Sequence, residues 1–216
     1  MTAPVLYGFW RSLATFRVRV ALNLKGLEAR ETSIDIFNGA QYDPEFVAVN
    51  PMSAVPALVE EGQAALTQSL AIIEYLDETH PAPPLLPPTP RGRAEARALA
   101  LMVAADAHPL VVPRVRNYLS GVLGLDEPAR NAWIAHWSRA ALAALEQRLA
   151  GRPGPWCMGE QLTLADICLA THVAGAKLTG IDLTDFPASL AIAERALALE
   201  PFARAHPLRQ AGAPAR

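Results

Sequence analysis

The sequence has little cysteine, no run of basic residues and no long uncharged apolar stretch. Its two cysteines among 216 residues, Cys157 and Cys168, are eleven apart and lack His neighbours at ligand spacing, so neither a metal site nor a disulfide framework is indicated. A formal net charge of −2 argues against nucleic acid as a partner. Because a signal-like N-terminus is also missing, we expect a cytoplasmic protein without a membrane partner.

Strand and helix signals alternate along the first eighty residues. A hydrophobic content of 51% permits a full core, and the length allows one compact body or two modest domains. Apolar spacing predicts the order strand, helix, strand, short helix, antiparallel hairpin turning at Glu61-Gly62, and helix. These elements are expected at 4–10, 16–26, 28–36, 43–51, 54–68 and 69–80. The order βαβαββα predicts a thioredoxin-like α+β domain, but no CxxC follows the first strand, which argues against dithiol chemistry.

A proline-rich segment separates two parts of the chain that differ in amino-acid composition. Residues 81–90, PAPPLLPPTP, hold six prolines and cannot form a regular helix or a central strand. Beyond it the chain is rich in Ala and Leu at helical spacing, with almost no strand signal. We therefore predict a thioredoxin-like domain at 1–80, a stiff linker at 81–90 and an all-helical domain at 91–216.

Five motifs in order resemble the cytosolic glutathione transferases, and among them the zeta class with its maleylacetoacetate and maleylpyruvate isomerases. They are FWRS with RVRVALNLKG, NPMSAVPAL, QSLAIIEYL, the LLP of the linker, and LTLADICL. The resemblance runs from Leu6 to about Arg209. It implies the cytosolic glutathione transferase fold, glutathione as cosubstrate and a homodimer. In LTLADICL, Thr163 and Asp166 have the spacing of a capping box, which we assign to folding rather than to chemistry.

Ser12 stands where the first helix begins, so its hydroxyl could cap the helix or hold an anion. Aligned on Arg17-Val18-Arg19, the family signature Ser-Ser-Cys-Ser/Ala reads Ser12, Leu13, Ala14 and Thr15 here. Only the first serine is kept, and Ala14 removes any role of the cysteine. We predict that Ser12 serves the glutathione sulfur at a helix start near Thr15, with Thr15 as the competing cap or hydroxyl donor. The resemblance assigns Arg11 to the acidic substrate.

The glutathione site is predicted on two further motifs. A cis Val55-Pro56 bond would turn the Val55 backbone outward to pair with the cysteinyl part of glutathione, as the resemblance implies; an ordinary trans edge-strand proline is the alternative. Gln68 and Ser69, with Ser69 as helix N-cap, are assigned to the γ-glutamyl end. Gln41 is also predicted to bind glutathione.

The helical domain departs from the family pattern. In DAHPLVVPRV, His108 matches a residue near the glutathione end, and Arg114 is a candidate second cation for an acidic substrate. Val111 and Val112 replace paired asparagines, and Pro113 is expected to interrupt the helix. Leu178 stands where the family carries an arginine; the adjacent Lys177 would point about 100° away.

The resemblance implies a glutathione-dependent cis–trans isomerase of maleylacetoacetate-like diacids in aromatic amino acid or aromatic ring catabolism. The alternative catalytic hypothesis is a glutathione transferase that acts on small haloacids or other electrophiles. A noncatalytic binding module is disfavoured because Ser12, Val55-Pro56 and Gln68-Ser69 are all present.

Overall fold

The computed structural model describes residues 2–214 and divides them into two compact units. The first unit contains residues up to 85 together with those from 198 onward, and the second contains residues 86–197. The C-terminal segment thus belongs to the unit of the N-terminal strands, whereas the sequence places it with the helical domain. The functional division at 81–90 stays a prediction.

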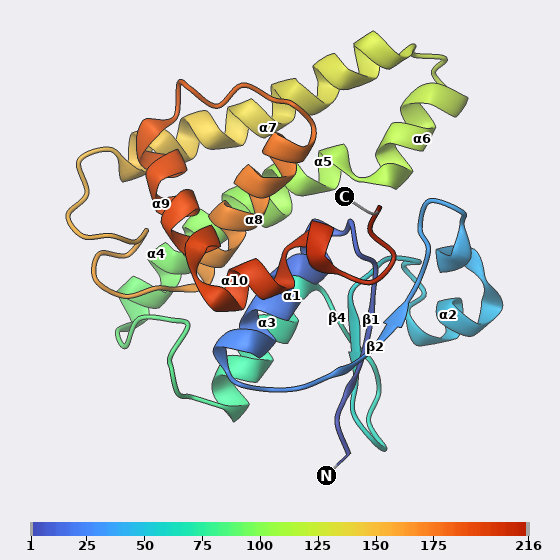
Figure 1. The fold of residues 1–216 in the computed structure, drawn as a ribbon, viewed down its shortest axis with the longest axis horizontal. Helices are drawn as coiled ribbons and strands as arrows, with labels where there is room; N and C mark the ends of the chain where they lie inside the picture. Colours follow the sequence, from blue (N-terminus) through green and yellow to red (C-terminus); the bar gives the residue numbers. More distant parts are fainter. Residues whose placement is uncertain (1, 215–216) are drawn as a thin grey trace. The chain divides into compact units, whose positions relative to one another are not determined.

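The first unit is built on a four-stranded mixed sheet (Figure 1). The strand order is β2-β1-β3-β4, with β1 parallel to β2 and antiparallel to β3, and β3 antiparallel to β4. The predicted βαβαββα order is confirmed. Its elements are β1 (Val5–Gly8), α1 (Leu13–Leu24), β2 (Arg30–Ser33), α2 (Pro44–Val49), β3 (Ala57–Val59), β4 (Leu66–Thr67) and α3 (Ser69–Thr79).

Local signals explain where these elements end. Helix α1 closes at Gly26, whose φ of 65° lies in the left-handed region that glycine adopts readily. The Leu27 N–H reaches Leu22 O at 2.9 Å and the Gly26 N–H reaches Asn23 O at 3.2 Å, which is the Schellman arrangement. The predicted hairpin turn is also present, since Gly62 has φ of 74° and the Gln63 N–H donates to Glu60 O.

The C-terminal segment lies along α1 in both ribbon views (Figure 1). It carries α10 (Glu200–Ala205) and a short 3₁₀ turn, Pro207–Arg209. Asn23 Nδ2 donates to Pro201 O at 2.8 Å, and the Phe16 ring meets His206 edge-on at 5.7 Å between centroids. Because Phe16 and Phe202 are fully buried, this segment completes the core of the first unit.

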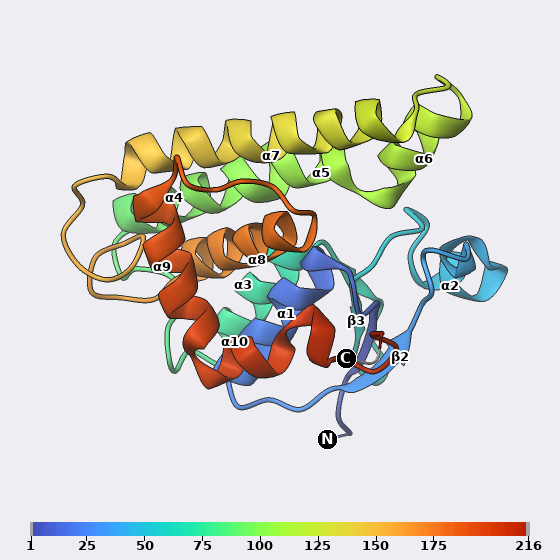
Figure 2. The same ribbon diagram turned by 45° about the horizontal axis from the view of Figure 1, so that its top comes forward.

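The second unit is all-helical. Helix α8 (Leu164–Leu178) is its centre, since thirteen of its fifteen residues are buried and it packs against α4. Helix α7 runs beside the segment that contains α5 and α6 (Figure 2). The other helices are α4 (Pro90–Leu101), a π-helical turn (Met102–Ala107), α5 (His108–Val111), α6 (Pro113–Gly121), α7 (Glu127–Leu149) and α9 (Pro187–Ala198).

The run Pro90–Gly121 is long and apolar enough, by length and composition alone, to match a membrane span. It is not one regular helix. A π-turn interrupts it at Met102–Ala107, and an extended residue, Val112 with ψ of 158°, separates α5 from α6. Pro113 explains the second break, because a residue before proline is pushed out of the helical region. The expected interruption at Pro113 is therefore confirmed.

Candidate functional site

Ser12 is the N-cap of α1. Its Oγ accepts the Thr15 N–H at 3.1 Å, and its backbone is extended, as an N-cap requires. The helix begins at Leu13, so the expectation of a start near Thr15 is wrong, and Thr15 is not the cap. The correction has a simple cause: a capping side chain bonds the N–H three residues later, so the residue it reaches is already inside the helix.

Thr15 faces the interior of the first unit. It is fully buried, and its methyl group points at β1: a Cβ added at Gly8 would lie 2.5 Å from Thr15 Cγ2. Its Oγ1 is buried and has no hydrogen-bond partner among residues 2–214. Ser12, by contrast, is half-buried at the turn between β1 and α1, next to the half-buried Arg11. Of the two hydroxyls, the one on Ser12 is the more accessible.

Gln41 lies in a one-turn 3₁₀ helix, Ala40–Tyr42, that precedes α2. Only 6% of the residue is exposed, and its Oε1 is buried with no hydrogen-bond partner in the described part of the chain. A buried acceptor without a donor is costly unless something supplies one. The side chain is therefore suited to receive an N–H from a bound molecule.

The loop before β3 is held in shape by one buried side chain. Asn50 donates from Nδ2 to Ala54 O at 2.6 Å and accepts the Met52 N–H at 3.1 Å. The loop leads into a cis Val55-Pro56 bond, as predicted. Val55 precedes the first paired residue of β3, Ala57, so its backbone lies beyond the ladder. Asn-Pro favours a turn, but no local pattern marks the Asn50 side chain as the group that holds the loop.

The start of α3 differs from the prediction in one respect. Ser69 is the first helical residue, and Gln68 is the N-cap, with φ of 68° and no side-chain cap bond. A non-glycine residue in this region is uncommon and draws attention to the position. Ser69 is already inside the helix, and its Oγ accepts Arg17 Nε of α1 at 3.1 Å.

Arg17 is a site residue that sequence reasoning missed. It is 2% exposed, although it is charged and lies on a helix. Buried arginine needs partners, and one of its donors reaches Ser69 at the N-terminus of α3. The guanidinium therefore adds positive charge at a helix end that already favours anions. The sequence does contain a signal for this role, because Arg17 belongs to the Arg17-Val18-Arg19 motif that resembles the family.

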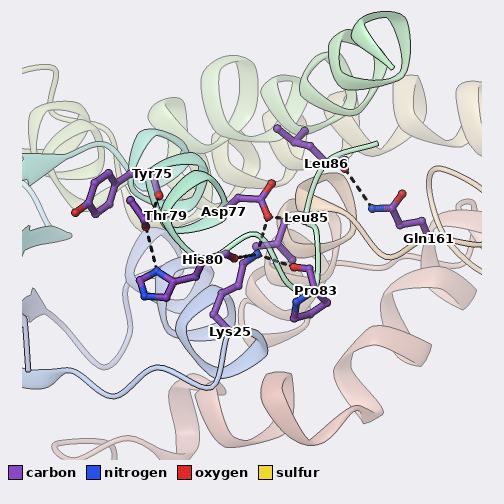
Figure 3. Close-up of polar contacts among 9 residues, drawn as sticks. All are labelled: Lys25, Tyr75, Asp77, Thr79, His80, Pro83, Leu85, Leu86 and Gln161. Carbon is purple, nitrogen blue, oxygen red and sulfur yellow. Dashed lines mark hydrogen bonds and ion pairs between the residues drawn. The ribbon is translucent and has the colours of Figure 1, made fainter. Parts of the chain in front are cut away.

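A buried lysine holds the other end of α3 (Figure 3). The Lys25 side chain is 0% exposed, and its Nζ donates at 2.6 Å to Asp77 Oδ1, His80 O and Pro83 O. Asp77 also accepts the Leu85 N–H at 2.8 Å. These contacts, here called the Lys25 staple, join the end of α1 to the end of α3 and to the proline-rich segment. All three ammonium protons are used, so the staple is structural.

The predicted residues of the second unit lie on either side of the break at Val112. His108 is half-buried at the start of α5, directly after the π-turn, and Arg114 is exposed in the first turn of α6. Single π-turns inside helices occur often at functional sites. The indole Nε1 of Trp133, on α7, donates to Leu110 O at 2.8 Å between these two residues.

Lys177 lies beside Leu178, where the resemblance implies an arginine, at the end of α8. Lys177 is exposed, and its Nζ forms an ion pair with Glu194 of α9 at 2.7 Å. Leu178 is half-buried. Lys177 is thus already engaged on the side of α9.

The two cysteines are buried. Burial raises the pKa of the Cys157 thiol far above its usual range, with nearby Asp166 adding to the rise. Asp166 belongs to the predicted capping box, which is present: its carboxylate accepts Thr163 N–H and Cys157 N–H, each at 2.7 Å. Burial also raises the pKa of Asp166. Among residues 2–214, no cluster of three His, Cys, Asp or Glu side chains could hold a metal ion.

Ser12, Arg11, Thr15, Gln41, Val55, Pro56, Gln68 and Ser69 thus belong to the first unit, and His108 and Arg114 to the second. Within the first unit, the structure joins Ser12 to Thr15 and Ser69 to Arg17. This part of the chain carries three groups of hydrogen-bonding atoms suited to a peptide-like anion: the start of α1, the Val55 backbone and the start of α3.

Comparison with known proteins gives consistent matches over the whole chain. Residues 11–79 match the glutathione S-transferase N-terminal domain and residues 127–199 the C-terminal domain. Maleylacetoacetate isomerase of Rhizobium meliloti is 43% identical over 207 residues, covering 95% of this chain and 96% of that protein.

Two solved structures are also similar. One is maleylacetoacetate isomerase from Methylobacterium extorquens AM1 with bound malonate and glutathione, 47% identical with a TM-score of 0.95, covering 98% of this chain and 100% of the other. The second is the holo structure of maleylpyruvate isomerase, a bacterial zeta-class glutathione transferase, 39% identical with a TM-score of 0.93, covering 97% and 100%.

Proposed function

Because this chain belongs to the zeta-class glutathione transferases and maleylacetoacetate isomerases, we propose that it is a glutathione-dependent cis–trans isomerase of maleylacetoacetate-like diacids. Glutathione supplies a thiolate that adds reversibly to the conjugated cis double bond, which allows rotation about a single bond before elimination. The observation that carries the proposal is the match to isomerases over nearly the full length of both chains. The pairing of glutathione with malonate, a small diacid, in the M. extorquens structure supports it.

Individual atoms of the first unit support this assignment of glutathione. Gln41 Oε1 is a buried acceptor that finds no donor among residues 2–214, and a peptide or ammonium N–H of glutathione would satisfy it. The Val55 backbone lies beyond the β3 ladder and would pair with the cysteinyl part. Gln68 and Ser69 at the start of α3 would receive the γ-glutamyl carboxylate, helped by the charge of Arg17.

Ser12 can cap the helix and serve the sulfur together. A hydroxyl has two acceptor lone pairs and one donor proton. Capping uses a lone pair, since Ser12 Oγ accepts the Thr15 N–H. The proton remains available to donate to a thiolate, which would favour ionisation of a thiol with an ordinary pKa of about 8.5. We therefore assign Ser12 to the sulfur, and Thr15 to packing of α1 on β1.

The substrate diacid needs cations for its carboxylates and donors for the charge that develops on addition. We assign Arg11 to a substrate carboxylate from the first unit, and Arg114 to a carboxylate from the second, with His108 at the glutathione end. Arg114 lies in the first turn of α6, where the helix dipole adds to its charge. The first domain would bind glutathione, and the helical domain from about residue 91 would bind substrate.

The setting of this activity is part of the same proposal. An isomerase of such diacids belongs in aromatic amino acid or aromatic ring catabolism, in the cytoplasm. We propose a homodimer as the working form, with glutathione and a small acid as its ligands.

The deciding experiment follows diacid absorbance with maleylacetoacetate or maleylpyruvate, with and without glutathione. We expect isomerisation that requires glutathione and that falls when Arg11 is changed to Ala. A chlorinated acid is assayed in parallel for halide release. Rapid halide release without isomerisation would replace this proposal with a transferase acting on haloacids.

A further inference from the structure

We propose that Trp133 is a positioning residue for the substrate end of the site, which it shapes by holding the helix break between His108 and Arg114. The inference rests on the proposed function for the role of Arg114. One contact carries it: the indole N–H of Trp133 on α7 donates to the carbonyl of Leu110 at 2.8 Å.

The Leu110 carbonyl loses its ordinary partner at the break. In a continuous α-helix it would accept the N–H of Arg114, four residues later. Val112 is extended, with φ of −73° and ψ of 158°, so α6 starts afresh with Val112 as its N-cap. The Val112 carbonyl accepts the N–H groups of Val115 and Arg116 at 3.0 and 3.1 Å. Trp133 takes the place of the missing helix donor.

The location of this bond gives it a functional consequence. Leu110 lies two residues after His108 and four before Arg114, so its carbonyl is in the short segment that sets both side chains. Arg114 is exposed and depends on its backbone for direction. If the bond is lost, the Leu110 carbonyl must turn toward water, and the first turn of α6 turns with it. If the Arg114 guanidinium moves about an ångström away from a substrate carboxylate, the charge-assisted hydrogen bond between them is weakened.

Helix α7 provides its own control one turn away. Trp137 packs against Trp133, with ring centroids 5.8 Å apart. Its Nε1 is buried and has no hydrogen-bond partner among residues 2–214. Trp133→Phe therefore removes an indole and a hydrogen bond, whereas Trp137→Phe removes an indole alone.

The experiment measures malonate binding by calorimetry on the full-length protein saturated with glutathione, for Trp133→Phe, Trp137→Phe, Arg114→Ala and the Trp133→Phe/Arg114→Ala double variant. We expect Trp133→Phe to raise the malonate Kd about five- to tenfold, as one hydrogen bond warrants, and Trp137→Phe to change it less than about twofold. Glutathione affinity should stay within about twofold in both. In the Arg114→Ala background, Trp133→Phe should have no further effect, which a merely structural role would not produce.

Equal effects of the two tryptophan variants, or a Trp133→Phe effect that persists in the Arg114→Ala background, would overturn the inference. Should Trp133→Phe fold poorly, benzothienylalanine at position 133 keeps the ring shape and replaces the N–H by sulfur, and it must give the same rise in Kd. Malonate binding needs no turnover. A protein that binds malonate through Arg114 but does not isomerise diacids would contradict the proposed function and leave this inference standing.

Discussion

The starts of α1 and α3 and the run from α4 to α6 hold their polar residues in opposite ways. In the first region, Ser12 and Ser69 are engaged by hydrogen bonds inside their own unit, and a buried Arg17 stands between the two helices. In the second, Arg114 is exposed on a helix run interrupted twice, and the contact beside it is Trp133 with Leu110. The comparison teaches that the proposed glutathione end is tied into the hydrogen bonds of its own unit, whereas the proposed substrate end lies on a surface that substitutions can reshape.

Departures from the family pattern fall in both units. Leu13 and Ala14 lie in the first unit, and Val111, Val112 and Leu178 lie in the second. Ala14 is buried, whereas the other four are half-buried. A change at a buried position acts first on the free energy of folding, and a change at a half-buried one can also alter what binds.

The largest effect is expected in the first unit, at the ends of α1 and α3 that lie opposite the two helix starts. Lys25→Met removes all three donors of the Lys25 staple and leaves Asp77 with the Leu85 N–H alone. Loss of one partner of a buried ion pair costs about 3 kcal/mol of unfolding free energy. Urea denaturation followed by circular dichroism measures it.

The matched control is Lys177→Met, which removes an exposed lysine of the second unit and its ion pair with Glu194. It should cost no more than about 1 kcal/mol. Equal losses for the two variants would mean that the buried Lys25 staple of the first unit contributes no more to stability than an exposed ion pair of the second unit.

Ser12→Ala separates capping from sulfur activation. Loss of the cap should lower the free energy of unfolding by about 1 kcal/mol. Loss of a hydroxyl that donates to the glutathione thiolate should lower kcat about a hundredfold. Thiolate absorbance of the glutathione complex against pH gives the direct measurement, and the thiol pKa should rise. Cys157 does not interfere, since burial raises its pKa far above its usual range.

Ser12→Thr is the control, because threonine keeps both the cap and the hydroxyl. It should retain most of the activity and the titration curve. If Ser12→Ala lowers the melting temperature but leaves the titration unchanged, Ser12 is only a cap.

Much of the first unit and part of its site could be predicted from the sequence because the signals are local. Alternating apolar runs indicated the sheet and helices, and S/T-x-x-D indicated the capping box of α8. The error at Ser69 arose because the local pattern makes serine the better cap, whereas the helix starts at Ser69 itself, with Gln68 as N-cap and Arg17, 52 residues away, bonded to the Ser69 hydroxyl. Long-range contacts such as this, or Trp133 with Leu110, leave no periodic trace in the sequence.

Arg17→Met tests the contact that sequence reasoning missed. The variant removes a buried positive charge and the donor to Ser69 Oγ, while the long apolar side chain keeps much of the packing. A hydrogen bond to a charged group contributes about 1.5–3 kcal/mol, so glutathione affinity should fall by about ten- to a hundredfold. Calorimetry with glutathione measures it.

Arg19→Met controls for loss of a buried arginine from the same helix, since Arg19 pairs instead with Glu31 of β2. It should lower stability and leave glutathione affinity within about threefold. A similar loss of glutathione affinity in both variants would mean that α1, rather than the Arg17–Ser69 contact, is responsible.

The smallest effect is expected from restoring a cation at the end of α8. Leu178→Arg places a guanidinium where the family carries one, on a half-buried residue whose neighbour Lys177 is tied to Glu194. Arginine in the last turn of a helix also suits the helix dipole, so stability should be unchanged or slightly raised. Because the long side chain loses rotamer freedom on binding, we expect a gain of only about three- to tenfold in kcat/KM for the diacid.

The gain should appear as a lower KM for the diacid, with the KM for glutathione unchanged. Leu178→Gln, similar in length but uncharged, should give no gain. If Arg and Gln act alike, the end of α8 does not bind the diacid by charge, and the contrast between a fixed proposed glutathione end and an adjustable proposed substrate end is not extended to this helix by electrostatics.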